Sequence, residues 1–111
     1  MTITAVALQP GIQLPATVDP VISALTTAAQ ITSAVFTNTN SSVELVTIYL
    51  VRSGGAPGPA NIVIDAQPIA PKQAYVAREL SGRNLAGGDT LWGFSTDDAV
   101  TNVVVDGFTV S

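Results

Sequence analysis

The sequence predicts an all-β protein: a single-domain antiparallel β-sandwich, jelly-roll-like, with about eight short strands. Three observations lead to this expectation. Segments rich in Val, Ile and Thr alternate with a period of two residues, whereas helical periodicity is hard to find. Clusters of Gly, Pro, Asn and Asp separate these segments at spacings of roughly ten residues. A length of 111 residues is ordinary for one domain with one core.

The composition is that of a sheet-rich protein with few charges. Hydrophobic residues make up 47% and charged residues 11% of the chain, against about a quarter charged in an ordinary soluble domain. The mean hydropathy is +0.44. Thr, Ser, Asn and Gln occupy the positions where Lys and Glu would usually stand, which favours a sheet surface over a helix surface. We therefore expect part of the surface to be covered by partners.

The same composition argues against several classes of function. A net charge of −4 with four basic residues rules out a basic patch for nucleic acid. The absence of Cys and His removes disulfides, thiolate metal sites and the usual nucleophile–base pairs. We expect no enzyme activity, cofactor or metal. The N-terminal residues lack the pattern of a signal peptide, and no stretch reads as a membrane span, so no membrane partner is expected.

The first 29 residues are predicted to be an N-terminal strand or arm and a Pro-rich segment of the same domain, and residues 30–111 its β-sandwich body. Residues 2–8 form the first predicted strand. Residues 10–20 contain three prolines and one glycine, which favours an extended arm or a surface loop. A short second strand is predicted at residues 20–26.

The strongest predicted strand is Val43–Arg52. Both of its faces are apolar, which is typical of a central strand or of one packed against a partner. The preceding strand, Gln30–Thr39, is expected to pair with it as a hairpin across the polar turn at residues 38–42. Residues 53–60 (SGGAPGPA) are the best candidate for the most exposed loop, because their Gly and Pro density opposes regular structure.

The second half of the chain is predicted to contain four more strands, at residues 61–66, 72–80, 91–96 and 100–110. Pro68 indicates an edge strand or a bulge, because proline cannot donate to a sheet ladder. Asp106-Gly107 is expected to bend or bulge the last strand.

Few side chains could carry chemistry. Without His, the base for a nucleophile would have to be Lys72 or a carboxylate. Paired carboxylates could do acid/base work, either Asp97 beside Asp98 or Glu79 brought near Asp89. A solvated turn is the commoner role for the first pair, and a surface ion pair with a neighbouring arginine is the commoner role for Glu79. The Asp spacing does not match a calcium loop, and the glycine-rich loop lacks the features of a phosphate site.

The aromatic residues are the remaining binding candidates. Trp92 and Phe94 share one side of a predicted strand, where packing in the core is the usual role and anchoring a partner is the alternative. Trp92 or Tyr75 could also stack on a sugar. Tyr49 lies on the second apolar face of the strongest strand and is the better candidate for an interface aromatic.

The order of several short motifs resembles a family of small structural proteins of tailed bacteriophages. The motifs cover about residues 30–110 and are I-T-S-A-V-F-x-N-x-N at 31–40, Y-L-V-x-S-G-G at 49–55, I-A-P at 69–71, E-L-x-G-x-x-L-x-x-G-D at 79–89 and D-G-F-x-V at 106–110. Each motif consists of residues that are common in turns between strands. The order of the motifs is what makes the resemblance to the family specific.

The resemblance implies a virion component made in the host bacterial cytoplasm and located on the capsid surface. For a protein of this size it implies a capsid decoration, cement or staple protein with a jelly-roll-like fold and no catalytic residues. Its expected partners are the major capsid protein and further copies of itself, as a dimer or trimer. A tail, neck or fibre-associated protein and a carbohydrate-binding β-sandwich are the alternatives.

Partner binding is predicted at the N-terminal arm and at Tyr49. A β-rich arm can add a strand to a neighbour's sheet edge. The alternative is an ordinary strand in the protein's own sheet. The residues predicted to contact a partner are Thr2, Ile3, Thr4, Val6, Leu8 and Tyr49.

Overall fold

The structure is a computed structural model that describes residues 2–23 and 25–110. This part of the chain forms nine β-strands and one short 3-10 helix at Pro59–Asn61. The strands are β1 Ile3–Gln13, β2 Asp19–Ile22, β3 Ala28–Asn38, β4 Glu44–Val51, β5 Ile62–Ile69, β6 Ala74–Val76, β7 Asn84–Leu85, β8 Thr90–Ser95 and β9 Thr101–Val110. The all-β prediction is confirmed.

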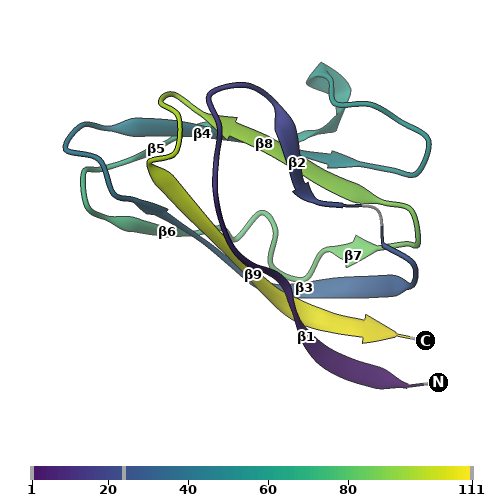
Figure 1. The fold of residues 1–111 in the computed structure, drawn as a ribbon. Coiled ribbons are helices and arrows are strands. Elements are labelled where there is room, and N and C mark those ends of the chain that lie inside the picture. Colours follow the sequence, from purple (N-terminus) through teal and green to yellow (C-terminus); the bar gives the residue numbers. More distant parts are fainter. Residues whose placement is uncertain (1, 24, 111) are drawn as a thin grey trace.

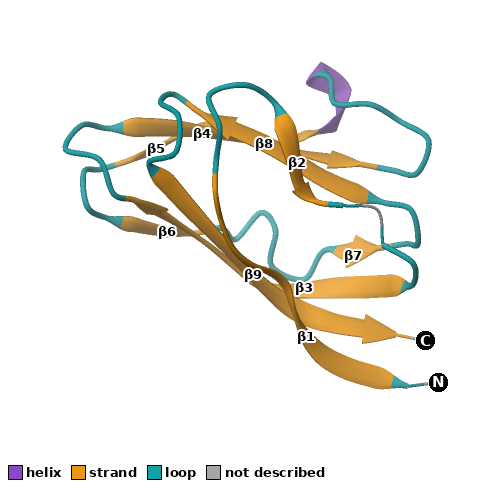
Figure 2. Ribbon diagram, viewed as in Figure 1, coloured by secondary structure: helices purple, strands orange, loops and turns teal. Residues whose placement is uncertain are grey.

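The strands form two antiparallel sheets that pack face to face (Figure 2). One sheet has the order β1-β9-β3-β6, and β7 also pairs with β3. The other has the order β2-β8-β4-β5. Buried side chains alternate with more exposed ones along β3, β8 and most of β9, as the period-two pattern predicts, and the buried ones point between the sheets. The predicted β-sandwich is therefore confirmed.

The pairing of the strands is that of a jelly roll. β1 pairs with β9, β2 with β8, β3 with β6 and β7, and β4 with β5. The two members of each pair lie at nearly equal distances along the chain on either side of residues 53–60: Ile3 is opposite Val110, and Tyr49 is opposite Ile62. The chain is thus one long antiparallel hairpin that folds over itself into two sheets (Figure 1).

The core lies between the two sheets. β3 and β4 contribute the most side chains to it, and β2, β5, β7, β8, β9 and the loops contribute the rest. Its largest fully buried apolar side chains within the hydrophobic cluster are Leu14, Ile31, Phe36, Val46, Ile48, Leu80, Leu85, Leu91, Val103 and Val105. β4 lies between β8 and β5, which confirms its central position.

The predicted hairpin between residues 30–39 and 43–52 is wrong, because β3 and β4 belong to different sheets. The turn between them carries the chain across the sandwich. Asn38, buried at the end of β3, donates from Nδ2 to the carbonyls of Ser42 (2.8 Å) and Ile69 (2.9 Å). These bonds tie the turn to the end of β5, so the chain enters the opposite sheet.

Two predicted strand boundaries also change. β1 continues past Pro10 to Gln13, where a loop was expected. It does so as an edge strand with register shifts on either side of Gln9, a position where proline is tolerated. The strand expected at residues 72–80 is reduced to β6, Ala74–Val76, and the residues after it form turns.

An irregularity is present at Asp106-Gly107, but the extra residue, Thr32, belongs to β3 and not to the last strand as predicted. The register between β3 and β9 shifts between Ile31 and Ser33, opposite these two residues. A Cβ on Gly107 would overlap the carbonyl oxygen of Gln30 and lie 2.7 Å from Leu8 Cδ1. Glycine therefore lets β1, β9 and β3 approach one another at this point.

Candidate interaction surfaces

The predicted N-terminal arm is an edge strand of the protein's own sheet. β1 pairs with β9 along its length, from Ile3 opposite Val110 to Gln13 opposite Asn102. Its other edge faces away from the sheet, because β1 is the first strand in the order. Four of the predicted arm residues, Ile3, Thr4, Val6 and Leu8, lie on β1, and exposed Thr2 precedes it.

Side chains on β1 differ in what they contact. Leu8 packs against the hydrophobic core and is partly buried. Ile3 is 61% exposed and is the most exposed large apolar residue of the described chain. Thr4 is exposed and Val6 partly buried. The predicted arm residues thus divide into a core contact at Leu8 and an accessible segment before it.

Tyr49, the other predicted contact residue, lies in the opposite sheet. It is on β4, directly across from Trp92 on β8. Its ring stacks on that of Phe94, with ring centroids 6.3 Å apart and planes inclined by 30°. The structure therefore does not bring Tyr49 together with the β1 residues.

Trp92 does not join the core, although core packing was the expected role. Its neighbours Leu91 and Gly93 are buried, so alternation along β8 directs Trp92 and Phe94 to the outer face of the sheet. Both are partly buried there. The Trp92 indole Nε1–H donates to Thr90 Oγ1 on the same strand (2.9 Å). The predicted common side of Trp92 and Phe94 is confirmed.

The outer face of β4 and β8 presents an uncharged surface, which we call the aromatic face: Leu45, Tyr49, Trp92 and Phe94. Glu44 is the single charged residue in these two strands, and it is buried. Leu45 is 43% exposed, and Val43, just before β4, is 52% exposed. Exposed apolar residues gathered on one face are typical of a binding surface.

The outer face of the other sheet carries a smaller apolar row. Val35 on β3 is opposite both Val76 on β6 and Val104 on β9. Val76 is 60% and Val104 38% exposed. Thus each sheet has apolar side chains turned to the outside, and among residues 2–23 and 25–110 the stacked aromatic pair lies on the β4–β8 face.

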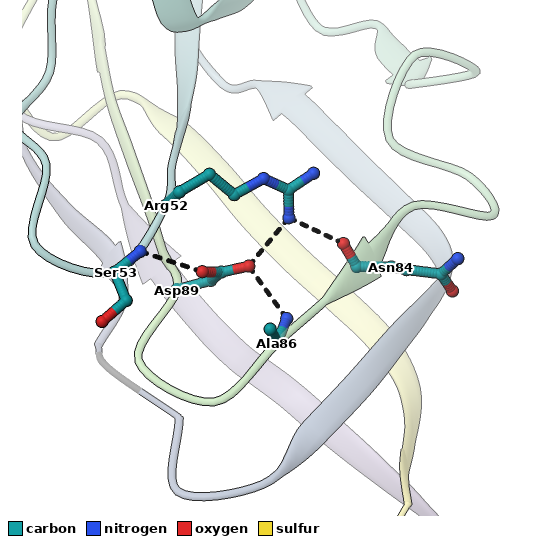
Figure 3. A network of polar contacts seen from close by, with 5 residues as sticks. All are labelled: Arg52, Ser53, Asn84, Ala86 and Asp89. Atoms are coloured by element: carbon teal, nitrogen blue, oxygen red, sulfur yellow. Dashed lines mark hydrogen bonds and ion pairs between the residues drawn. The ribbon is translucent and has the colours of Figure 1, made fainter.

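The Asp89 carboxylate joins the end of β4 to the turn before β8 (Figure 3). It is 2% exposed and accepts hydrogen bonds from Arg52 Nη1 (2.7 Å), the Ser53 N–H (3.0 Å) and the Ala86 N–H (2.8 Å). Burial alone would raise the pKa of Asp89, but these bonds outweigh it and hold the pKa below its usual value. Arg52 also donates to the Asn84 carbonyl (3.0 Å). The arrangement stabilises two loops.

The pairing of Glu79 with Asp89 considered from the sequence is not formed. Glu79 instead accepts the Tyr75 hydroxyl at 2.7 and 2.8 Å. Burial, together with this contact, raises the pKa of Tyr75. Glu79 and Asp89 are therefore not placed to work together as an acid/base pair.

A carboxylate contact that the sequence did not reveal joins Glu44 to Asp97. Glu44 is fully buried and accepts the Asp97 N–H (2.9 Å), while Asn40 Nδ2 lies 3.4 Å from Glu44 and 3.3 Å from the Asp97 carboxylate. Burial raises the pKa of Glu44, and the Asp97 carboxylate adds to this effect. The alternation of β4 places Glu44 on the inward face of the strand, and this alternation was the signal in the sequence that Glu44 would be buried.

Residues 2–23 and 25–110 show no pocket and no group of three or more acidic residues placed to hold a metal ion. In the same part of the chain, no helix is long and apolar enough to cross a membrane.

Comparisons with known proteins identify no family for this chain. No protein-family model matches the sequence, and no curated protein matches it at a significant level. A structural comparison matches a chain of the T13 IBDV viral particle, with a TM-score of 0.44 and 12% sequence identity. The match covers 95% of this chain and 30% of that chain, so this chain spans about a third of its length.

Proposed function

We propose that this protein is a non-enzymatic structural component of a tailed-phage virion that binds the outer surface of the capsid at subunit junctions and stabilises the head. The order of the sequence motifs points to this class of protein. The observation that carries the proposal is the aromatic face, an uncharged outer surface on the two central strands of one sheet.

The aromatic face is suited to docking on another protein. Tyr49 and Phe94 are already stacked, so binding would cost little side-chain entropy. Covering Leu45 and the partly buried rings would remove apolar area from water, the main favourable term in association. The single charged residue of β4 and β8, Glu44, is buried and does not lie on this face. Docking on the aromatic face would therefore not remove a charged side chain of these strands from water. Many weakly bound copies on one particle would add up to a strong stabilising effect.

Fractionating particles tests the location. Purified virions are separated into heads and tails, and the protein is detected in each fraction. We expect it with the heads. Recovery wholly with the tails would overturn the capsid assignment and favour a tail, neck or fibre-associated role.

A pair of matched variants tests the surface. Leu45→Lys places a charge on the aromatic face, whereas Val104→Lys places one on the opposite sheet at a similar exposure, 43% against 38%. Both are added to heads that lack the protein, and bound protein is measured by sedimentation. We expect Leu45→Lys to lose binding and Val104→Lys to retain it. Equal binding of the two folded variants would contradict the proposed surface.

Carbohydrate binding is the second candidate, favoured by the partly exposed Trp92 beside Tyr49. Aromatic faces of this kind can stack on sugar rings. A glycan array probed with the parent protein and with Trp92→Ala tests it. A glycan signal that the variant loses would favour this function, and no signal from the parent counts against it.

A further inference from the structure

Three of the four sheet edges in the described chain are unsuited to pairing with another strand. β2 has four residues and includes Asp19 and Pro20. β5 is interrupted by Ala66, whose φ is +47°, and by Pro68. The edge opposite β1 is formed by β6, which has three residues, and by β7, which has two. Short length, charge, proline and irregular backbone are the usual means by which natural sheets avoid edge-to-edge association.

The edge of β1 has none of these protections over Ile3–Ala7. This segment pairs with β9 residue for residue, and the register shifts begin only after Ala7. All of its side chains are exposed except Val6, which is partly buried. The first charged residue of the whole sequence is Asp19. Regular, uncharged and accessible backbone of this kind is a template for an added strand.

We propose that Ile3–Ala7 pairs antiparallel with the same segment of a second copy of this chain, about a two-fold axis. The two β1 strands would join their sheets into one continuous sheet. With the axis near Ala5, Ile3 would lie opposite Ala7 of the second copy, and Thr4 opposite Val6. Ile3, now 61% exposed, would gain a neighbour.

Two features select a second copy as the occupant. Because the other three edges are blocked, β1 is the one edge on a neighbouring copy that matches β1, so the contact closes as a two-fold dimer and does not propagate. Each copy carries a net charge of −4, yet the paired segments hold no charge and bring no like charges together. The pairing needs no other protein and stands apart from the proposed capsid role.

The oligomeric state of the isolated full chain tests this proposal without any particle. Sedimentation velocity over a range of concentrations should show a dimer that dissociates on dilution. Ala5→Lys would set two lysines against each other and should raise the dimer dissociation constant by at least about tenfold. Ala74→Lys is the matched control, because Ala74 is an exposed alanine on the opposite edge of the same sheet. It should leave the dissociation constant unchanged.

Mixing Ala5→Lys with Ala5→Glu provides the second arm, read by native mass spectrometry. Opposite charges at the axis should restore dimerisation as a mixed dimer, at a concentration at which each variant alone is mostly monomeric. Circular dichroism checks folding, and Ala7→Lys replaces Ala5→Lys if the latter does not fold. A parent protein that stays monomeric, a folded edge variant that still dimerises like the parent, or a dimer broken by Ala74→Lys would each overturn the proposal.

Discussion

At the scale of single residues, the two buried carboxylates respond to protonation in opposite ways. The pKa of Asp89 is lowered by its three donors, whereas the pKa of Glu44 is raised by burial and by Asp97. The stabilising contribution of Asp89 is therefore present above the pKa it has in the unfolded chain and is lost as the pH falls through its folded value. For Glu44 the contribution is present at low pH and is lost as the pH rises through its folded value.

Asp89→Asn should lower the free energy of unfolding by about 2 kcal/mol at pH 7, because a buried charged acceptor is removed and an amide N–H is set against a donor. The loss should shrink as the pH falls below about 4, because Asp89 takes up a proton there in the unfolded parent, whereas in the folded parent its lowered pKa delays protonation to lower pH. Urea unfolding at pH 7 and at pH 3 measures both effects. Asp98→Asn, at an exposed turn, should change little. An Asp89→Asn effect that does not vary with pH would contradict the assignment.

Glu44→Gln should stabilise the protein relative to the parent as the pH rises, whereas Asp89→Asn should destabilise it. Gln keeps an oxygen to accept the Asp97 N–H but carries no charge to desolvate or to repel Asp97. Relative to the parent, the variant should therefore be more stable at pH 7 than at pH 4.

The measurement is the same urea series. A difference between Glu44→Gln and the parent that is equal at both pH values would show that Glu44 has an ordinary pKa in the folded protein.

At the scale of elements, the contact between β1, β9 and β3 depends on Gly107. Gly107→Ala should destabilise the protein by about 3 kcal/mol, because the added methyl group overlaps the Gln30 carbonyl and crowds Leu8. Thermal unfolding measures the loss. Gly58→Ala is the control, since a Cβ there meets nothing within 4 Å, and its effect should stay within about 0.5 kcal/mol. Equal effects of the two substitutions would mean that the strands can separate at Gly107 without cost.

Individual strands were largely predictable, whereas their partners were not. β4 and β9 have nearly the bounds expected from their alternating Val and Ile. The expected β3–β4 hairpin failed because Asn38 bonds to Ile69, more than thirty residues away, and turns the chain into the other sheet. The aromatic face likewise has a part that the sequence predicted and a part that it did not. Tyr49 was proposed from the sequence as an interface aromatic, whereas its position beside Trp92 and Phe94 depends on the pairing of β8 with β4.

At the scale of the whole molecule, the jelly roll brings the two ends of the chain side by side, since Ile3 pairs with Val110 (Figure 1). A circular permutant can join these ends with a short linker and open within residues 53–60. It should fold cooperatively, because the new opening lies in a loop and leaves all the strand pairs intact. Circular dichroism and thermal unfolding measure this. Opening between Asn40 and Ser41 should be far less tolerated, because it breaks the turn that Asn38 holds. If both permutants fold equally well, that turn does not direct the crossover.

The sequence by itself determined the all-β class, the places of most strands and the loop at residues 53–60 about which the chain folds back. These depend on alternation and on Gly and Pro, which act through neighbouring residues. The tertiary structure alone decided which strands share a sheet, that Trp92 faces outward, that Glu44 meets Asp97 and that Ile3–Ala7 forms an open edge. Each of these features depends on contacts between residues far apart in the chain. The local pattern of the sequence does not predict such contacts.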